Sequence, residues 1–399
     1  MSFSQAVSGL NAAANNLDVI GNNIANSATF GFKSSTTAFA DVFSGSDVGL
    51  GVKVSGVIQN FKDGSTTRTD RRLDVAITQG GFFRMEDANG SVFYSRNGQF
   101  QMDSERNLIN MQGMKLTGYP VVNGEVQVGG ELSPLSIPTM MMDAKVTGNA
   151  QIKAGLNSME PVITEVFDAT KKETYNFKEP LTVFDSLGNE HVLDVFFVKT
   201  ADNKWDVHVQ DTSVKDAEVQ KNVSQLAFTA SGQLETVATG TFNMKGLNGS
   251  ADANIGLDFT GSKQQSIGTN TITAKTQDGY APGDFTNFRV DNDGKIYGTY
   301  SNGRNQVLGQ IVLANFANPE GLAAQGDNVW TESGASGNPI VGLAGSGNLG
   351  RLVSGALESS NVDMSQELVN MIVAQRNYQS NAQTIKTQDQ ILQTLVSLR

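Results

Sequence analysis

Apolar side chains recur at seven-residue spacing near both ends of the chain. Such a repeat keeps one stripe of a helix facing a partner helix, as in a coiled coil. Each seven-residue repeat has two positions that face the partner helix. Near the start of the chain, the residues at these two positions are Phe3, Val7, Leu10, Leu17 and Ile24. Near the end, they comprise Met364, Leu368, Met371, Tyr378, Ile385, Leu392 and Leu395. The pattern therefore predicts amphipathic helices over residues 1–30 and 361–399.

Outside these stripes, both predicted helices consist mostly of uncharged amide and hydroxyl side chains. Asp18 is the only charged residue between Met1 and Phe32, and residues 375–393 are rich in Gln and Asn. A thin apolar stripe buries too little surface to stabilise an isolated helix. We therefore expect the terminal helices to pair with each other or with copies of themselves, as in a polymer subunit whose ends become ordered on assembly.

The middle of the chain is predicted to be mainly β-structure. Apolar and polar residues alternate over 73–77 and 205–210, and a strand-and-turn pattern returns over 285–316. The 42 glycines and scarce prolines fit strands joined by tight turns. Residues 31–70 are rich in Ser, Thr and Gly with only short β-like runs. They are predicted to form an irregular, extended connector.

If the terminal helices pair, residues 1 and 399 lie near each other and the domains are nested. The expected fold class is α+β and multidomain, with paired, coiled-coil-like terminal helices and β domains inserted between them. The expected parts are a terminal helical domain (1–30 with 361–399), the connector (31–70), an inner β domain (71–144 with 285–360) and an outer β domain (145–284).

The composition excludes several classes of partner. The formal net charge is −11 and the 29 Lys and Arg residues are scattered, which argues against binding to nucleic acid or to anionic membrane surfaces. No apolar run approaches the roughly 20 residues that span a bilayer, so no membrane insertion is expected. The chain has no cysteine, which removes disulfides and thiol chemistry.

The beginning of the sequence lacks the cationic and apolar regions of a Sec signal. This leaves either a cytosolic protein or one exported without a cleaved Sec signal.

Motifs that could support catalysis or cofactor binding are weak. Residues 345–350 match G-x-G-x-x-G, but a dinucleotide site needs that motif between a strand and a long helix. Residues 291–294 resemble part of a calcium loop, yet the twelfth position would be Asn302 rather than Glu. His191 and His208 are interpreted as plain surface histidines or as histidines with satisfied hydrogen bonds. We therefore expect no enzyme activity, cofactor or metal.

Specific runs of residues resemble one protein family. Asn22, Asn23, Asn26, Thr29, Gly31, Phe32 and Lys33 stand in a segment that resembles the N-terminal signature of the bacterial flagellar rod and hook family. Residues 355–358, 367–369 and 375–378 resemble its C-terminal signature, and residues 73–83, 94–98 and 116–120 its first β domain. The resemblance covers roughly 1–120 and 285–399.

The resemblance implies a structural subunit, and the long insertion over 145–284 is similar to that of the hook-forming members. These polymerise into the flexible tube that transmits motor torque from rod to filament as a universal joint. The implied location is the extracellular hook of the flagellum. The implied partners are the chain itself, the rod, the hook cap, the hook–filament junction proteins and the flagellar type III export apparatus. Phe39 and Phe43 resemble the family's export signal.

Other functions stay open at this point. A subunit of the distal rod is the alternative within the family. A secreted β-rich binding module with oligomerising ends is the alternative outside it.

Overall fold

The computed structural model describes residues 3–42, 49–122, 124–215 and 217–397. Phe43 and the Leu395 side chain lie outside the described residues. Within the described residues, the chain divides into two compact units. Unit 1 comprises Met1–Pro138, Asn287–Thr299 and Asn305–Arg399, and unit 2 comprises Thr139–Thr286 and Tyr300–Arg304. Unit 2 is thus inserted into the chain of unit 1.

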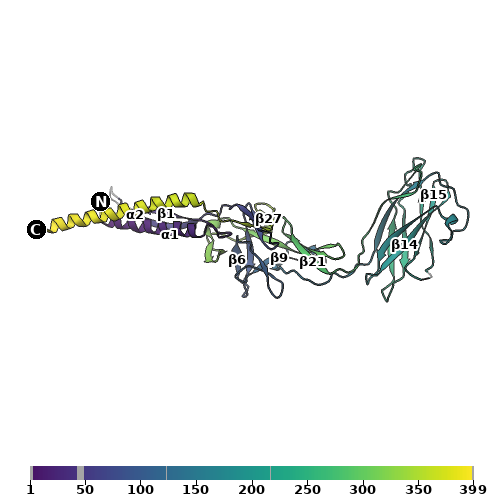
Figure 1. Ribbon diagram of the computed structural model, residues 1–399, viewed down its shortest axis with the longest axis horizontal. Helices are drawn as coiled ribbons and strands as arrows, with labels where there is room; N and C mark the ends of the chain where they lie inside the picture. The colour runs from purple at the N-terminus through teal and green to yellow at the C-terminus, as the bar shows by residue number, and fades with distance from the viewer. Residues whose placement is uncertain (1–2, 43–48, 123, 216, 398–399) are drawn as a thin grey trace. The chain divides into compact units, whose positions relative to one another are not determined.

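The terminal helices of unit 1 pair with each other, as the seven-residue repeats predicted. Helix α1 spans Phe3–Ala25 and helix α2 spans Met364–Ser397. They lie side by side (Figure 1) and run antiparallel, because Gly9 near the start of α1 faces Asn381 in the second half of α2. Asp363 caps α2, since its Oδ1 accepts hydrogen bonds from the N–H groups of Ser365 at 2.9 Å and Gln366 at 3.2 Å.

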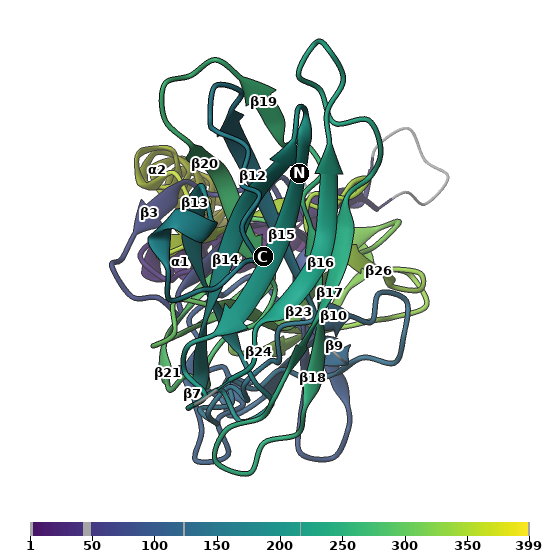
Figure 2. The ribbon, with the colours of Figure 1, turned by 90° about the vertical axis from the view of Figure 1, so that its right-hand side faces the viewer.

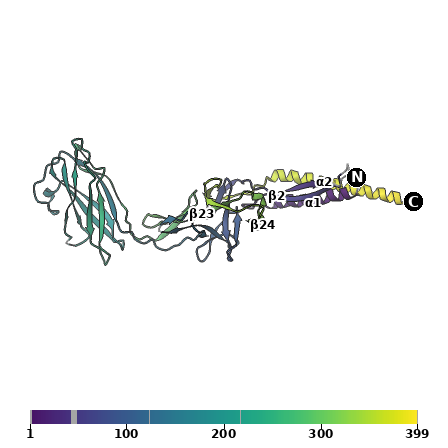
Figure 3. The same cartoon turned by 180° about the vertical axis from the view of Figure 1, so that it is seen from behind.

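The prediction of an irregular connector over 31–70 was wrong. Strands β1 (Ser35–Asp41) and β2 (Val52–Gln59) form an antiparallel hairpin that lies along α1 (Figure 3). The Ser8 hydroxyl accepts a hydrogen bond from the N–H of Val52 at 3.3 Å. Packing against α1 stabilises these strands, although their own alternation of apolar and polar residues is weak. A local stretch of sequence does not reveal such a tertiary contact.

The rest of unit 1 is a set of mostly short antiparallel strands, several of which join segments far apart in the chain. Its strands are β3 (Thr66–Arg68), β4 (Val75–Thr78), β5 (Phe82–Glu86), β6 (Val92–Ser95), β7 (Gln101–Met102), β8 (Leu108–Ile109), β9 (Lys115–Val122), β10 (Glu125–Val126), β11 (Ser133–Pro134), β21 (Phe285–Val290), β22 (Lys295–Tyr300), β23 (Asn305–Asn315), β24 (Ala323–Gly326), β25 (Val329–Thr331), β26 (Ile340–Leu343), β27 (Arg351–Ser354) and β28 (Ala356–Glu358). The pairs β27–β4 and β28–β3 tie the segment before α2 to the segment after the hairpin.

Unit 2 packs one sheet on another around a buried apolar core that includes Trp205 and Phe259. One sheet has the order β13-β14-β15-β16, seen side by side in Figure 2. The other has the order β17-β18-β12-β19, with β20 also paired to β12. The strands are β12 (Asn149–Asn157), β13 (Phe177–Phe184), β14 (Glu190–Ala201), β15 (Lys204–Asp211), β16 (Gln220–Ala227), β17 (Thr239–Met244), β18 (Ala253–Asp258), β19 (Lys263–Gln265) and β20 (Thr271–Gln277).

The architecture is therefore α+β and multidomain, with paired terminal helices and mainly β-structure between them. Among the described residues, neither helix is long and apolar enough to cross a membrane.

Candidate assembly site

Buried side chains, most of them small, mark the contact between α1 and α2. Ala6, Ala13 and Ile20 are 4 %, 7 % and 5 % exposed, and they also repeat every seven residues. Among the described side chains of α2, the buried one is that of Ala374. Gly9 lies so close to Asn381 that a Cβ at Gly9 would stand 2.8 Å from the Asn381 Oδ1 atom. Small residues let the two helices approach closely. The sequence analysis did not identify this row of buried residues, because it assigned the seven-residue repeat to larger apolar side chains.

The larger seam residues flank this line and are only partly covered in one chain. The half-buried ones are Val7, Leu10, Leu17, Ile24, Met371 and Ile385. The exposed ones are Phe3, Met364, Leu368, Tyr378 and Leu392. Their role in assembly stays a prediction.

Exposed large apolar side chains gather on the terminal module, which we define as α1, α2 and the β1–β2 hairpin. On α2 the exposed side chains also include those of Val369, Ile372, Val373, Ile391 and Val396. On the hairpin they are those of Phe39, Val57 and Ile58. An exposed apolar surface of this extent is typical of a protein–protein interface.

The N-terminal signature holds the end of α1 against the hairpin. The Asn23 side chain is buried; its Nδ2 donates to the Ser35 carbonyl at 2.8 Å and its Oδ1 accepts from the Ser35 N–H at 2.9 Å. Asn26 donates to the Asn22 carbonyl at 3.0 Å, and the Thr29 hydroxyl donates to Asn26 Oδ1 at 3.2 Å. These bonds satisfy backbone groups where α1 ends.

Gly31 is required where the chain leaves α1. Its φ is +72°, and a Cβ there would lie 2.6 Å from the backbone nitrogen of Asn97. Its N–H donates to the Glu358 carbonyl at 2.8 Å. Phe32 beside it is 9 % exposed. The signature thereby brings the next residue, Lys33, to the interior of unit 1.

Lys33, Arg96 and Glu358 form a buried charge cluster and are 0 %, 1 % and 2 % exposed. The Lys33 Nζ atom lies 2.7 Å from Glu358 Oε1, and the Arg96 Nε atom lies 3.0 Å from Glu358 Oε2. The Gly64 N–H donates to Glu358 Oε1 at 2.9 Å. Arg96 also pairs with Asp63, which is partly exposed. We call Lys33, Arg96 and Glu358 the buried charge cluster.

Hydrogen bonds complete the surroundings of the cluster. Lys33 Nζ donates to the Lys62 carbonyl at 2.7 Å, and Arg96 donates to the Gly81 carbonyl at 2.7 Å. Burial lowers the pKa of Lys33, the positive charge of Arg96 lowers it further, and Glu358 opposes both. Such a cluster is unfavourable to break, because removing one partner leaves a buried charge uncompensated.

The cluster joins segments that carry three separate parts of the family resemblance. Lys33 ends the N-terminal signature, Arg96 belongs to the first β segment, and Glu358 precedes α2. Asn361 adds a neutral tie, because its side chain accepts from the Ser34 N–H at 2.8 Å and donates to the Asn60 carbonyl at 2.7 Å. The geometry fixes the start of α2 and the end of α1 to the same β-structure.

In unit 2, the buried histidines have protein partners. His191 Nδ1 lies 2.6 Å from an Asp211 carboxylate oxygen and its Nε2 lies 3.4 Å from Asp185. His208 stacks on Phe167 at a centroid distance of 4.3 Å, and its Nδ1 accepts from the Asn222 N–H at 2.9 Å. Within the part of the chain that the structure describes, no group of His, Cys, Asp and Glu is placed to hold a metal ion.

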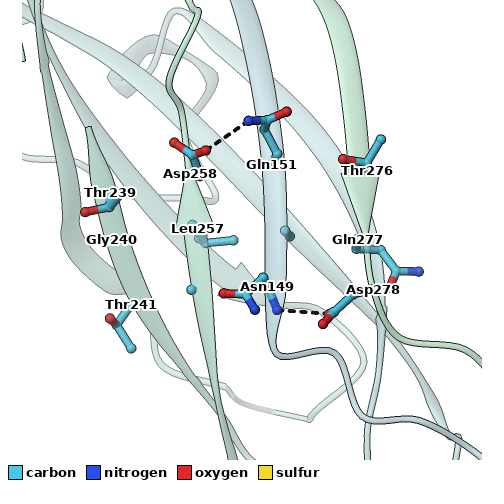
Figure 4. A pocket seen from close by; sticks show the side chains of 12 residues that line it. Asn149, Gln151, Thr239, Gly240, Thr241, Leu257, Asp258, Thr276, Gln277 and Asp278 are labelled. Carbon is cyan, nitrogen blue, oxygen red and sulfur yellow. Dashed lines mark hydrogen bonds between the residues drawn. The ribbon is translucent and has the colours of Figure 1, made fainter. Parts of the chain in front are cut away.

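A hollow of about 660 Å³ lies over strands β12, β17, β18 and β20 of unit 2 (Figure 4). Its carboxylates are already hydrogen-bonded: Gln151 donates to Asp258 at 2.9 Å, and Asp278 accepts from the Asn149 N–H at 3.0 Å. Burial acts to raise the pKa of Asp278, but the N–H groups of Asn149 and Gly148 outweigh it and keep that pKa low. The arrangement provides a polar surface rather than a general acid.

The weak motifs of the sequence are turns. Residues 345–350 connect β26 to the strand β27 rather than to a helix, which removes the basis for a dinucleotide site. The Asp291–Gly294 segment is the tight turn between β21 and β22, with Gly294 at a φ of +85° and its N–H donating to the Asp291 carbonyl at 2.9 Å.

Comparisons with known families cover both ends and the middle of the chain. Residues 4–33 match the family described as flagella basal body rod protein, and residues 353–398 match the flagellar basal body rod FlgEFG protein C-terminal family. Residues 76–154 match the flagellar hook protein FlgE/F/G D1 domain, and residues 152–280 match the flagellar basal body protein FlaE D2 domain.

Full-length relatives have the same extent as this chain. It is 59 % identical to the flagellar hook protein FlgE of Salmonella typhimurium and 57 % identical to that of Escherichia coli, each over 100 % of both chains. The crystal structure of Helicobacter pylori FlgE2 aligns with a TM-score of 0.56 at 15 % identity, over 73 % of this chain and 100 % of that one, and shows the shared fold alone. The chain belongs to the flagellar hook protein family, whose members are structural subunits of the extracellular flagellar hook.

Proposed function

We propose that copies of this chain polymerise through the terminal module into the hook tube, the flexible joint that passes motor torque from rod to filament. The observation that supports this most directly is the concentration of exposed apolar side chains on α1, α2 and the hairpin. Side-by-side packing of terminal modules would cover these side chains, and the gain from burying apolar area would drive assembly.

The polar faces of the same helices suit the wall of a channel. Exposed amide side chains follow α2 at Gln375, Gln379, Gln383, Gln390 and Gln393. Uncharged amides present neither an apolar surface nor a fixed charge to an unfolded chain that passes along them. We therefore place this face toward the lumen of the tube and the β units outside it.

Further partners follow from the family and belong to the same proposal. They are the rod below the tube, the cap and junction proteins above it, and the type III apparatus that exports the subunit. Phe39 on β1 is exposed in the monomer, which suits a residue of an export signal, whereas Phe43 lies outside the described residues.

Electron microscopy of the purified chain, concentrated in ammonium sulfate and seeded with isolated rod–hook fragments, tests the proposal. Curved tubes are expected from the full chain, and no tubes are expected after deletion of residues 1–24. The truncated chain should keep buried Trp205 and Trp330 fluorescence if its β units remain folded. Normal tubes from the truncation would contradict assembly through the helices, and straight tubes would indicate a rod subunit instead.

A further inference from the structure

Helix α2 carries a carboxylate and a guanidinium that cannot meet within one chain. Glu367 and Arg376 are nine residues apart. At about 100° per residue they point to opposite faces of the helix, and at about 1.5 Å per residue they are offset by roughly 13.5 Å along its axis. Both residues stand in the runs that resemble the family's C-terminal signature, yet the hydrogen bonds and packing described above give neither of them a role.

Glu367 faces a groove between α1, β1 and α2. The groove has a volume of about 220 Å³ and is lined on its other sides by Asn16 and Ile20 of α1 and by Thr37 of β1. Glu367 is half-buried there. Within the described residues, its Oε1 accepts a long hydrogen bond of 3.5 Å from Asn370 and no other. Its Oε2 and the Thr37 hydroxyl have no hydrogen-bond partner within the described residues.

No described residue supplies a cation to this carboxylate. No ion pair to Glu367 is formed among the described residues, and α1 contributes no Lys or Arg to the groove. A half-buried carboxylate that has lost water without gaining a cation is unfavourable, so a positive group that enters the groove would be stabilising.

Among the described residues, Arg376 is a cation without a partner, and it lies on the opposite face of α2. It is exposed, and its side chain makes no ion pair or hydrogen bond within the part of the chain described here. Arg376 and Lys386 are the basic residues within α2. Lys386 lies 19 residues from Glu367, which turns it only about 100° away from the groove face. Arg376 is therefore the cation placed to reach a second copy beside it.

We propose that Arg376 of one copy enters the groove of the neighbouring copy and pairs with Glu367 there. The inference rests on the proposed self-assembly and names its charged contact. Each copy would offer Arg376 to one neighbour and Glu367 to the other, which is a heterologous contact that repeats without closing into a dimer. Parallel α2 helices in adjacent copies would then be staggered by roughly 13.5 Å.

Charge exchange tests the contact in the full-length chain. Glu367→Arg and Arg376→Glu should each raise the protein concentration needed for tube formation by roughly tenfold or more. An equal mixture of the two variants should assemble, because Arg376 of one then meets Glu367 of the other, and Arg introduced at 367 meets Glu introduced at 376. A chain that carries both Glu367→Arg and Arg376→Glu should assemble as well, because the two charges are exchanged and the pair is kept.

The controls are Asp18→Lys and Lys386→Glu, which change exposed charges on the same helices by the same amount. These two control variants should form tubes at a protein concentration within about threefold of that needed by the parent chain. Because the chain has no cysteine, Glu367→Cys with Arg376→Cys gives a clean second readout. A short bismaleimide should produce a ladder of linked copies in tubes, and Glu367→Cys with Lys386→Cys should not.

The outcomes separate the contact from the assembly itself. If the parent chain forms no seeded tubes, the proposed function fails and the contact with it. If the parent forms tubes but the mixture does not rescue assembly, or if the controls are as damaging as the exchanges, the contact alone is overturned. Tubes from each single variant at the parent concentration would overturn it too.

Discussion

Replacing Glu358 by Gln tests whether the buried charge cluster holds the terminal helices to the β-structure of unit 1. The substitution keeps the size of the side chain and an acceptor for the Gly64 N–H. It removes the negative charge that lies 2.7 Å from Lys33 Nζ and 3.0 Å from Arg96 Nε. Lys33 loses its only carboxylate partner within the described residues, whereas Arg96 retains Asp63.

The expected loss of stability follows from burial. Lys33 and Glu358 are 0 % and 2 % exposed, so water cannot replace the missing partner. Breaking such a buried pair costs about 3–5 kcal/mol. Unit 1 is large, so an m-value of about 3 kcal/mol/M in urea is reasonable. The midpoint of its unfolding should therefore fall by roughly 1–1.7 M.

Tryptophan fluorescence can follow unit 1 separately. The chain has two tryptophans, Trp330 in unit 1 and Trp205 in unit 2. In a Trp205→Phe background, Trp330 is the only reporter. Its indole N–H donates to Gln59 of β2 at 2.8 Å, so its emission also reports whether the hairpin stays attached.

A surface pair in the same unit provides the control. Arg289 and Asp291 lie 3.5 Å apart and are about half exposed, so Arg289→Gln should cost less than about 1 kcal/mol. Adding Lys33→Met to Glu358→Gln should restore part of the stability, because it removes the unpaired cation. Two results would refute the role assigned to the cluster. One is a urea midpoint of Glu358→Gln equal to that of Arg289→Gln, and the other is a Lys33→Met, Glu358→Gln variant that is less stable than Glu358→Gln alone.

Other substitutions probe the helix contacts and the pH response. Gly31→Ala should destabilise unit 1 by about 2–3 kcal/mol in the same urea assay, because φ is +72° and the Cβ would collide with the Asn97 backbone; an unchanged midpoint would contradict this. Gly9→Leu should weaken the pairing of α1 with α2 near Asn381, and faster hydrogen exchange in α1 than in a Gly21→Leu control would show it, since Gly21 has open space. Burial lowers the pKa of His208 in the folded chain. Below about pH 6.5 the unfolded chain therefore binds a proton at this histidine that the folded chain does not yet bind. The free energy of unfolding consequently falls as the pH falls toward the lowered pKa. The urea midpoint reported by Trp205 should therefore drop between pH 7.5 and 5.5, and a His208→Gln variant with the same drop would assign it to other groups.

The helices could be predicted because their signals are local. The seven-residue repeat located α1 and α2, and the Asp363 cap lay within a few residues of the predicted start of α2. The prediction that the ends pair was confirmed. The repeat did not identify the contact line, because Ala6, Ala13 and Ile20 repeat at the same spacing as the apolar residues beside them. Spacing alone does not say which of several neighbouring stripes lies closest to the partner.

The charge cluster could not be predicted, because its members are brought together by long-range strand pairing. Lys33 and Glu358 are 325 residues apart, and Arg96 and Glu358 are 262 residues apart. Each was visible in a run that resembled a family signature, but a charged residue in such a run is ordinarily assigned to the surface. The β1–β2 hairpin was missed for a related reason, since the face against which it packs is supplied by α1.

The position of the cluster bears on how a bending tube would deform. It fixes the end of α1 and the start of α2 to the same β-structure through ion pairs that are directional and shielded from solvent. Rotation of the helix pair within unit 1 would break fully buried pairs and leave a buried charge without a partner, whereas sliding at contacts between copies would exchange groups at the subunit surface, which water or a new partner can reach. We therefore expect the subunits of the hook to move as preformed units and the bending to be taken up at the surfaces between them. A Glu358→Gln chain that still assembles should then give tubes with softer bending, because the helices are no longer held rigidly to the β-structure.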